Sequence, residues 1–138
     1  MAETLPRFDD SEQSPKLPAE GTAIACAVSG KGLADQFVIR GAWRVTAEDR
    51  KQLGRGSIRS QIWVVAIHRE LRESWIGRPG GDAIVFADEE PPRGAVEGWF
   101  HASLAECCKL PQAARGEFDL FALLGPWKSE VVELLLRK

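Results

Sequence analysis

The sequence predicts an all-β fold, an immunoglobulin-like Greek-key β-sandwich of about seven short antiparallel strands with one or two short helical crossings. Apolar side chains alternate with period two along several short segments. Turns that contain Gly and Pro separate these segments at spacings typical of a sandwich rather than of βαβ units. The Cys and Trp framework of antibody domains is absent, so the prediction concerns architecture and no named family.

The chain has 138 residues, enough for one domain with a sizeable core. Residues 1–20 combine Pro, Ser, Asp and Glu with few apolar side chains, and such a segment does not offset the entropy lost on ordering. We therefore expect residues 1–20 to be a disordered leader and residues 21–138 to form a single β-sandwich domain.

The first half of the domain contains three predicted strands and a short helix. Residues 22–29 and 36–45 alternate along their length, but the alternation slips at Gly41, which suggests a bulge or a close approach of two backbones. Residues 46–54 begin with Thr and Asp at capping-box spacing and end at Gly, which indicates one or two helical turns. Residues 61–68 are apolar on both faces, so we expect a central strand that is covered twice or lies partly under a loop.

The second half begins with an irregular connection and returns to strands. We expect a short edge strand at residues 75–76 and further strands at residues 83–87 and 95–104. The Ser-Leu-Ala-Glu sequence that starts at Ser103 is a capping box. A short helix is therefore expected to run to Leu110, where the next residue is proline.

The densest core-forming signal is a C-terminal hairpin. Residues 117–124 alternate strictly, a Gly-Pro-Trp-Lys sequence makes a turn, and residues 130–136 resume the alternation. A helix that starts at Ser129 is the competing interpretation, but the short length and the adjacent valines favour a strand. The second strand keeps Val131 and Leu135 on its nominally outer face, so the hairpin has apolar side chains beyond those that the core needs.

The net charge is only −2, which indicates neither a nucleic-acid partner nor a membrane partner. Its distribution is uneven: residues 31–78 hold ten Lys and Arg against five Asp and Glu, whereas the rest of the chain holds eight against fifteen. The three cysteines are an odd number and two of them are adjacent, which argues for a reducing compartment. The first residues lack the features of a secretory signal, so we expect a cytoplasmic protein.

Residues suited to catalysis are few. The chain has two histidines, no tyrosine, and no nucleophile elbow, zinc-protease motif or dinucleotide-binding motif. We therefore expect no enzymatic activity, no cofactor and no metal. The alternative is a small metal-handling or catalytic accessory protein that uses Cys107, Cys108 and His101, because thiolate and imidazole are ligands for zinc and copper.

The tryptophans carry the functional prediction. Two of them lie beside Gly- or Pro-containing turns and next to a cation, where a tryptophan either folds back over the sandwich or anchors a partner. We expect a non-enzymatic module that mediates protein–protein interaction or self-association, in which loss of a turn tryptophan abolishes binding and leaves stability nearly unchanged. A purely structural subunit of a larger assembly is a further possibility. The predicted interaction residues are Trp75, Arg78, Trp127, Lys128, Val131 and Leu135.

Overall fold

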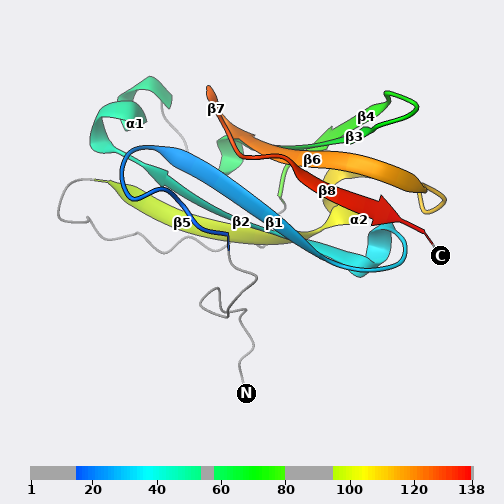
Figure 1. Ribbon diagram of the computed structural model, residues 1–138. Coiled ribbons are helices and arrows are strands. Elements are labelled where there is room, and N and C mark those ends of the chain that lie inside the picture. The colour runs from blue at the N-terminus through cyan, green and yellow to red at the C-terminus, as the bar shows by residue number, and fades with distance from the viewer. Residues whose placement is uncertain (1–14, 54–57, 80–94, 138) are drawn as a thin grey trace, which may run out of the picture.

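The computed structural model describes residues 15–53, 58–79 and 95–137, and these form two antiparallel sheets that face each other (Figure 1). The all-β prediction is therefore confirmed at the level of a two-sheet sandwich. The strand predicted at residues 83–87 lies outside the described residues. The strands are β1 (Ala23–Gly30), β2 (Phe37–Val45), β3 (Ile62–His68), β4 (Ser74–Gly77), β5 (Val96–Ser103), β6 (Gly116–Leu124), β7 (Trp127–Lys128) and β8 (Val132–Leu136).

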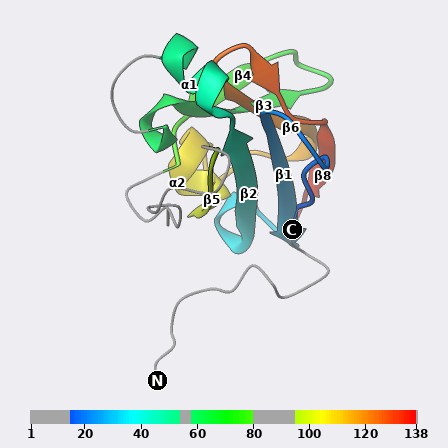
Figure 2. The same ribbon diagram turned by 90° about the vertical axis from the view of Figure 1, so that its left-hand side faces the viewer.

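Sheet A has the strand order β1-β2-β5, and sheet B has the order β4-β3-β6 with both β7 and β8 paired to the far side of β6. Strand β1 lies beside β6, β7 and β8, which brings one edge of sheet A to one edge of sheet B (Figure 2). On the opposite side, helix α2 (Leu104–Cys108) contacts β2, β3, β4 and β5 and fills the space between the sheets. The core is thus closed on one side by strands and on the other by a helix.

The period-two pattern places one face of each strand in the core. Along β6, Phe118, Leu120, Ala122 and Leu124 are all buried, as the sequence predicted. Strand β3 occupies the centre of sheet B, as its apolar sequence indicated. The largest fully buried side chains come from both sheets and from α2: Trp43, Phe100, Phe118, Ile39, Ile62, Leu104, Leu120, Leu124, Leu136, Val45, Val64 and Cys108.

The expected slip at Gly41 is wrong, because β2 keeps one unbroken register with both of its neighbours. Gly41 is instead a site of close approach: it pairs with Phe100 of β5, whose ring occupies the space that a Cβ would need. Two residues further along β2, the aromatic residue lies on β2 and the glycine lies on β5. Trp43 pairs with Gly98, and a Cβ at Gly98 would lie 2.5 Å from the indole ring. Each glycine therefore accommodates a large aromatic side chain on the core side of sheet A.

Both predicted helical crossings are present. Helix α1 (Ala47–Leu53) begins after Thr46, whose Oγ1 accepts from the Asp49 amide at 3.2 Å. Helix α2 begins at its Ser103 cap but ends at Cys108, before the expected Leu110, because Lys109 adopts a left-handed conformation with φ 58°. Within the described residues, no helix is long and apolar enough to cross a bilayer.

The predicted C-terminal hairpin is confirmed, and the competing helix from Ser129 is wrong. The returning chain pairs with β6 twice, first as the two-residue strand β7 and then as β8. Between these strands, the Ser129 hydroxyl accepts from the Ala122 amide at 2.9 Å and donates to the Glu130 carbonyl at 2.9 Å. This buried serine therefore satisfies backbone groups where the regular ladder is interrupted.

We expect substitutions at a glycine of sheet A and at the aromatic ring that covers it to have non-additive effects on the free energy of unfolding. Gly41→Ala should destabilise the protein by about 1–3 kcal/mol, because the added methyl group meets the Phe100 ring. In the double variant with Phe100→Leu, the smaller side chain leaves room for that methyl group. The combined loss in urea unfolding should then fall short of the sum of the single losses by about 1 kcal/mol or more. Additive losses would show that the two residues do not compete for space.

Candidate functional site

The outer face of sheet B carries several large apolar side chains. Strand register places Trp63 and Val65 of β3, Phe121 and Leu123 of β6 and Ile76 of β4 on this face. Trp63 is 38% exposed and Ile76 is 55% exposed, whereas Val65 is only 7% exposed. Large side chains of this kind are costly to leave in water, and their grouping on one sheet face is typical of a contact surface.

The outer face of sheet A is different in character. Its edge strand β1 presents Ala23, Ala25, Ala27 and Ser29 outward, because Ile24 and its period-two neighbours face the core. Most of the exposed large apolar side chains of the described residues belong to sheet B or its connections, and Val38 of β2 is the exception. These side chains are Trp63, Leu71, Ile76, Val131, Leu135 and Val38.

Two cations lie at one end of the apolar face of sheet B. The Arg78 guanidinium is 4.2 Å from the centre of the Trp63 ring, and the Lys128 Nζ is 4.9 Å from the centre of the Phe121 ring. Lys128 also donates to the Ser129 carbonyl at 3.0 Å. Both cations are held by aromatic rings, so they border the exposed apolar surface.

Carboxylates gather at the other end of the same face. The Arg69 guanidinium binds Asp119 at 2.9 Å, Glu133 at 2.8 Å and Glu117 at 3.3 Å. Hydrogen bonds with Asp119 and then Glu133 raise the pKa of Arg69 above its ordinary value, so this side chain stays charged. One guanidinium faces three carboxylates, which leaves the cluster with a net charge of −2. The face is therefore apolar in the middle, positive at one end and negative at the other.

The structure divides the six interaction residues predicted from sequence into two groups. Arg78, Lys128, Val131 and Leu135 are exposed, with Val131 at 47% and Leu135 at 43%. The turn tryptophans Trp75 and Trp127 are instead half-buried against the core. The ring centre of Trp75 lies 5.9 Å from that of Phe118, and Trp127 pairs with buried Leu124.

The sequence prediction singled out the two turn tryptophans and therefore missed Trp63 as a surface residue. A signal was present, because β3 is apolar at every position before His68 while its sheet has one core face. The period-two alternation places Trp63 opposite to buried Ile62 and Val64, on the outer side. Trp63 is the exposed tryptophan that the turn positions were expected to supply.

The residues of the alternative metal or catalytic site, Cys107, Cys108 and His101, are not brought together in the part of the chain that the structure describes. Cys107 and Cys108 are the last two residues of α2 and are buried in the core, and the Cys108 thiol donates to the Val64 carbonyl at 3.8 Å. A hydrogen bond with Cys107, followed by burial, raises the pKa of Cys108. His101 lies on the outer face of β5, in register with Arg40. No group of three or more His, Cys, Asp and Glu side chains among the described residues is arranged to hold a metal ion.

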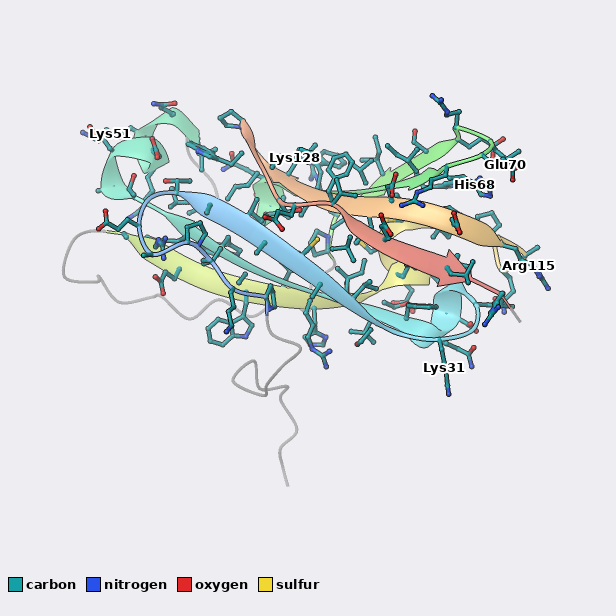
Figure 3. All side chains as sticks on the ribbon, in the orientation of Figure 1. Lys31, Lys51, His68, Glu70, Arg115 and Lys128 are labelled. Carbon is teal, nitrogen blue, oxygen red and sulfur yellow. The ribbon has the colours of Figure 1, made fainter. Side chains whose placement is uncertain are left out.

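His68 is engaged by the backbone on both ring nitrogens. Its Nδ1 accepts from the amides of Glu70 at 3.1 Å and Leu71 at 3.0 Å. A neutral ring therefore carries its proton on Nε2, which donates to the Arg115 carbonyl at 2.9 Å. Figure 3 shows His68 at the end of sheet B where the β3–β4 turn and the start of β6 meet. The histidine holds these two segments together and has no ring nitrogen left for catalysis.

Two grooves follow the seam where β1 approaches β7 and β8. One of them is lined in part by Cys26, whose Sγ lies 3.5 Å from the Ser129 Oγ. Burial raises the pKa of the Cys26 thiol, so this cysteine remains protonated and weakly nucleophilic. The groove therefore offers no activated nucleophile from this thiol.

Comparison with protein-family models, curated protein sequences and solved structures gives no match for this chain.

The two histidines make a matched pair for testing the structural role of His68. His68→Phe should reduce the free energy of unfolding by about 1–3 kcal/mol, because the amides of Glu70 and Leu71 lose their acceptor. His101→Phe, on the outer face of sheet A, should change it by less than about 0.5 kcal/mol. Imidazole ¹⁵N chemical shifts of the wild type should show the proton of His68 on Nε2. A proton on Nδ1 would contradict the assignment.

Proposed function

We propose that the protein is a non-enzymatic β-sandwich module that binds another protein, or a second copy of itself, through the outer face of sheet B. The observation that carries this proposal is the exposed Trp63, which lies among other outward apolar side chains of β3, β4 and β6. Tryptophan is enriched among the residues that dominate binding energy, particularly near the centre of an apolar patch with a polar rim. Arg78, Lys128, Val131 and Leu135 belong to the same surface, and Trp75 and Trp127 support it from below.

The polar ends of the face support binding to a protein rather than to a lipid or nucleic acid. A basic surface would be expected for phosphate groups. Here a cluster of net negative charge around Arg69 lies at one end of the face and the cations Arg78 and Lys128 lie at the other. A partner with both charge signs and an apolar centre matches this arrangement, and a folded protein surface has that composition.

We further propose that the sandwich has the Greek-key topology of immunoglobulin-like domains. The strand order supports this proposal. Sheet A, β1-β2-β5, corresponds to strands A-B-E, and β4-β3-β6-β8 of sheet B corresponds to C′-C-F-G. Residues 80–94, between β4 and β5, lie outside the described residues. In this correspondence, the proposed binding surface is the outer face of the sheet that contains C, F and G.

The free thiols of Cys26, Cys107 and Cys108 support the proposal that the protein works in the cytoplasm. Reducing conditions keep such thiols unpaired.

Site-specific photo-crosslinking tests the proposed surface. A photoreactive phenylalanine analogue at Ile76, on the outer face of sheet B, should give a covalent adduct with a specific protein in cells that naturally make this one. The same analogue at Val38 is the matched control, because this exposed apolar residue lies in sheet A. Trp63→Ser should remove the adduct formed from position 76 and lower the unfolding free energy by no more than about 1 kcal/mol, since the side chain contacts Arg78 at the surface. Equal labelling from both positions, or none from position 76, would contradict the proposal.

The turn tryptophans should behave differently from Trp63. We expect Trp75→Ala to cost about 2 kcal/mol of unfolding free energy, because this half-buried side chain packs against the ring of Phe118. The expectation from sequence that such a variant keeps its stability therefore changes. Chemical denaturation of the Trp75→Ala and Trp63→Ser variants side by side checks the difference, and equal stability of the two would show that Trp75 does not support the core.

A further inference from the structure

We propose that the outer face of sheet B is self-complementary and that two copies of the chain pair through it about a two-fold axis running across the strands. This inference rests on the proposed function, because it names a second copy as the partner of that surface. It comes from the order of charged and apolar side chains along the face, which follows from the strand register.

The face is built of rows that run across the strands. The first row is cationic at both edges, with Arg78 beyond Trp63 and with Lys128 paired to Leu123. The second row is apolar and contains Ile76, Val65 and Phe121, with Val131 just before β8. The third row holds Ile67, Asp119 and Glu133, and the fourth holds Arg69, Glu117 and Leu135.

Symmetry allows two simple ways to place this face against its own copy. In a face-to-face dimer the two-fold axis lies in the plane of contact. An axis parallel to the strands would set the cationic row of Lys128 against the same row of the partner. An axis across the strands, through the row of Phe121, reverses the order and sets the cationic row against the row of Asp119 and Glu133. The charges therefore select the second arrangement.

The selected arrangement brings specific residues together. Because the axis runs across the strands, each strand faces its own copy, and β7 and β8 share one side of β6. Lys128 of one copy then faces Glu133 of the other, and symmetry repeats the pair. Ile76 and Val131, the exposed members of the second row, face their own counterparts at the axis. Trp63 faces Ile67, and Leu123 faces Asp119, whose carboxylate is bound by Arg69. Figure 3 shows Lys128 on the side of sheet B that faces away from sheet A.

The size of the face sets the strength of the pairing. Strands lie about 4.8 Å apart and successive rows on one face lie about 6.8 Å apart, so four columns and the three rows that overlap project roughly 400 Å² on each copy. Two such faces bury about 800 Å² in total, which is below the size of a standard specific interface and fits only weak, reversible association. We therefore expect a monomer–dimer equilibrium with a dissociation constant of about 100 μM.

Two single charge reversals and their mixture test the pairing. Sedimentation velocity of the full chain, from about 5 to about 300 μM, should show dimerisation of the wild type that weakens with added salt. Lys128→Glu should place two carboxylates together in each pair of a homodimer, and Glu133→Lys should place two ammonium groups together. Each reversal should raise the dissociation constant by about tenfold or more, because every dimer contains the pair twice.

Mixing the two variants restores both opposite-charge pairs in the heterodimer. Native mass spectrometry of an equimolar mixture should therefore show the heterodimer in excess over either homodimer, and its dissociation constant should return to within about threefold of the wild-type value. This recovery excludes local disturbance of the Arg69 cluster as the cause of the weakening, since the heterodimer still contains one altered cluster. Val38→Ser, on sheet A, is the control that should leave the equilibrium unchanged.

The outcomes separate this inference from the proposed function. A wild type that stays monomeric to about 300 μM, or variants whose mixture forms no heterodimer, would overturn the self-pairing. In that case a cross-link from position 76 to a different protein would still support the binding surface. Dimerisation that Lys128→Glu and Glu133→Lys leave unchanged would also overturn the proposed axis. Loss of both the cross-link and the dimer would remove the proposed function as well.

Discussion

The structure depends on the way sheet A accepts two large aromatic side chains on its core face. Gly41 gives room to Phe100, and Gly98 gives room to Trp43, in neighbouring rows of the same strand pair. Because each ring covers a glycine, both rings fit between the sheets without displacing the backbone. Phe100 and Trp43 are among the largest fully buried side chains. The space that the two glycines leave for these rings therefore determines how sheet A packs against sheet B.

The two outer faces have different consequences for function. On sheet A, the small side chains of β1 leave little apolar area exposed, whereas on sheet B the outward positions of β3, β4 and β6 are large and apolar. The same strands must also supply the core on their inner side. A strand such as β3, apolar on both faces, is needed only where both faces are covered. In the proposed function, the partner covers the outer face of β3.

Several polar side chains of the described residues have structural roles. His68 uses both ring nitrogens to join the β3–β4 turn to the segment before β6. Ser129, which lies between β7 and β8 in the chain, accepts from the Ala122 amide of β6 where the ladder is interrupted. Cys107 and Cys108 are part of α2 and are buried in the core. In a small domain with few buried polar side chains, His68 and Ser129 satisfy backbone groups that the sheets leave open.

The amino-acid sequence by itself determined the strands, because period-two alternation and turn residues are local properties of the chain. It also determined both helix starts, through the caps at Thr46 and Ser103. It did not distinguish tryptophans in the core from tryptophans on the surface. Period-two alternation divides a strand into two faces but does not show which face is buried. Only the tertiary structure decided that Trp75 and Trp127 turn inward while Trp63 turns outward. Which face of a strand is buried depends on the opposing sheet, and the register of that sheet is set by contacts between residues far apart in the sequence.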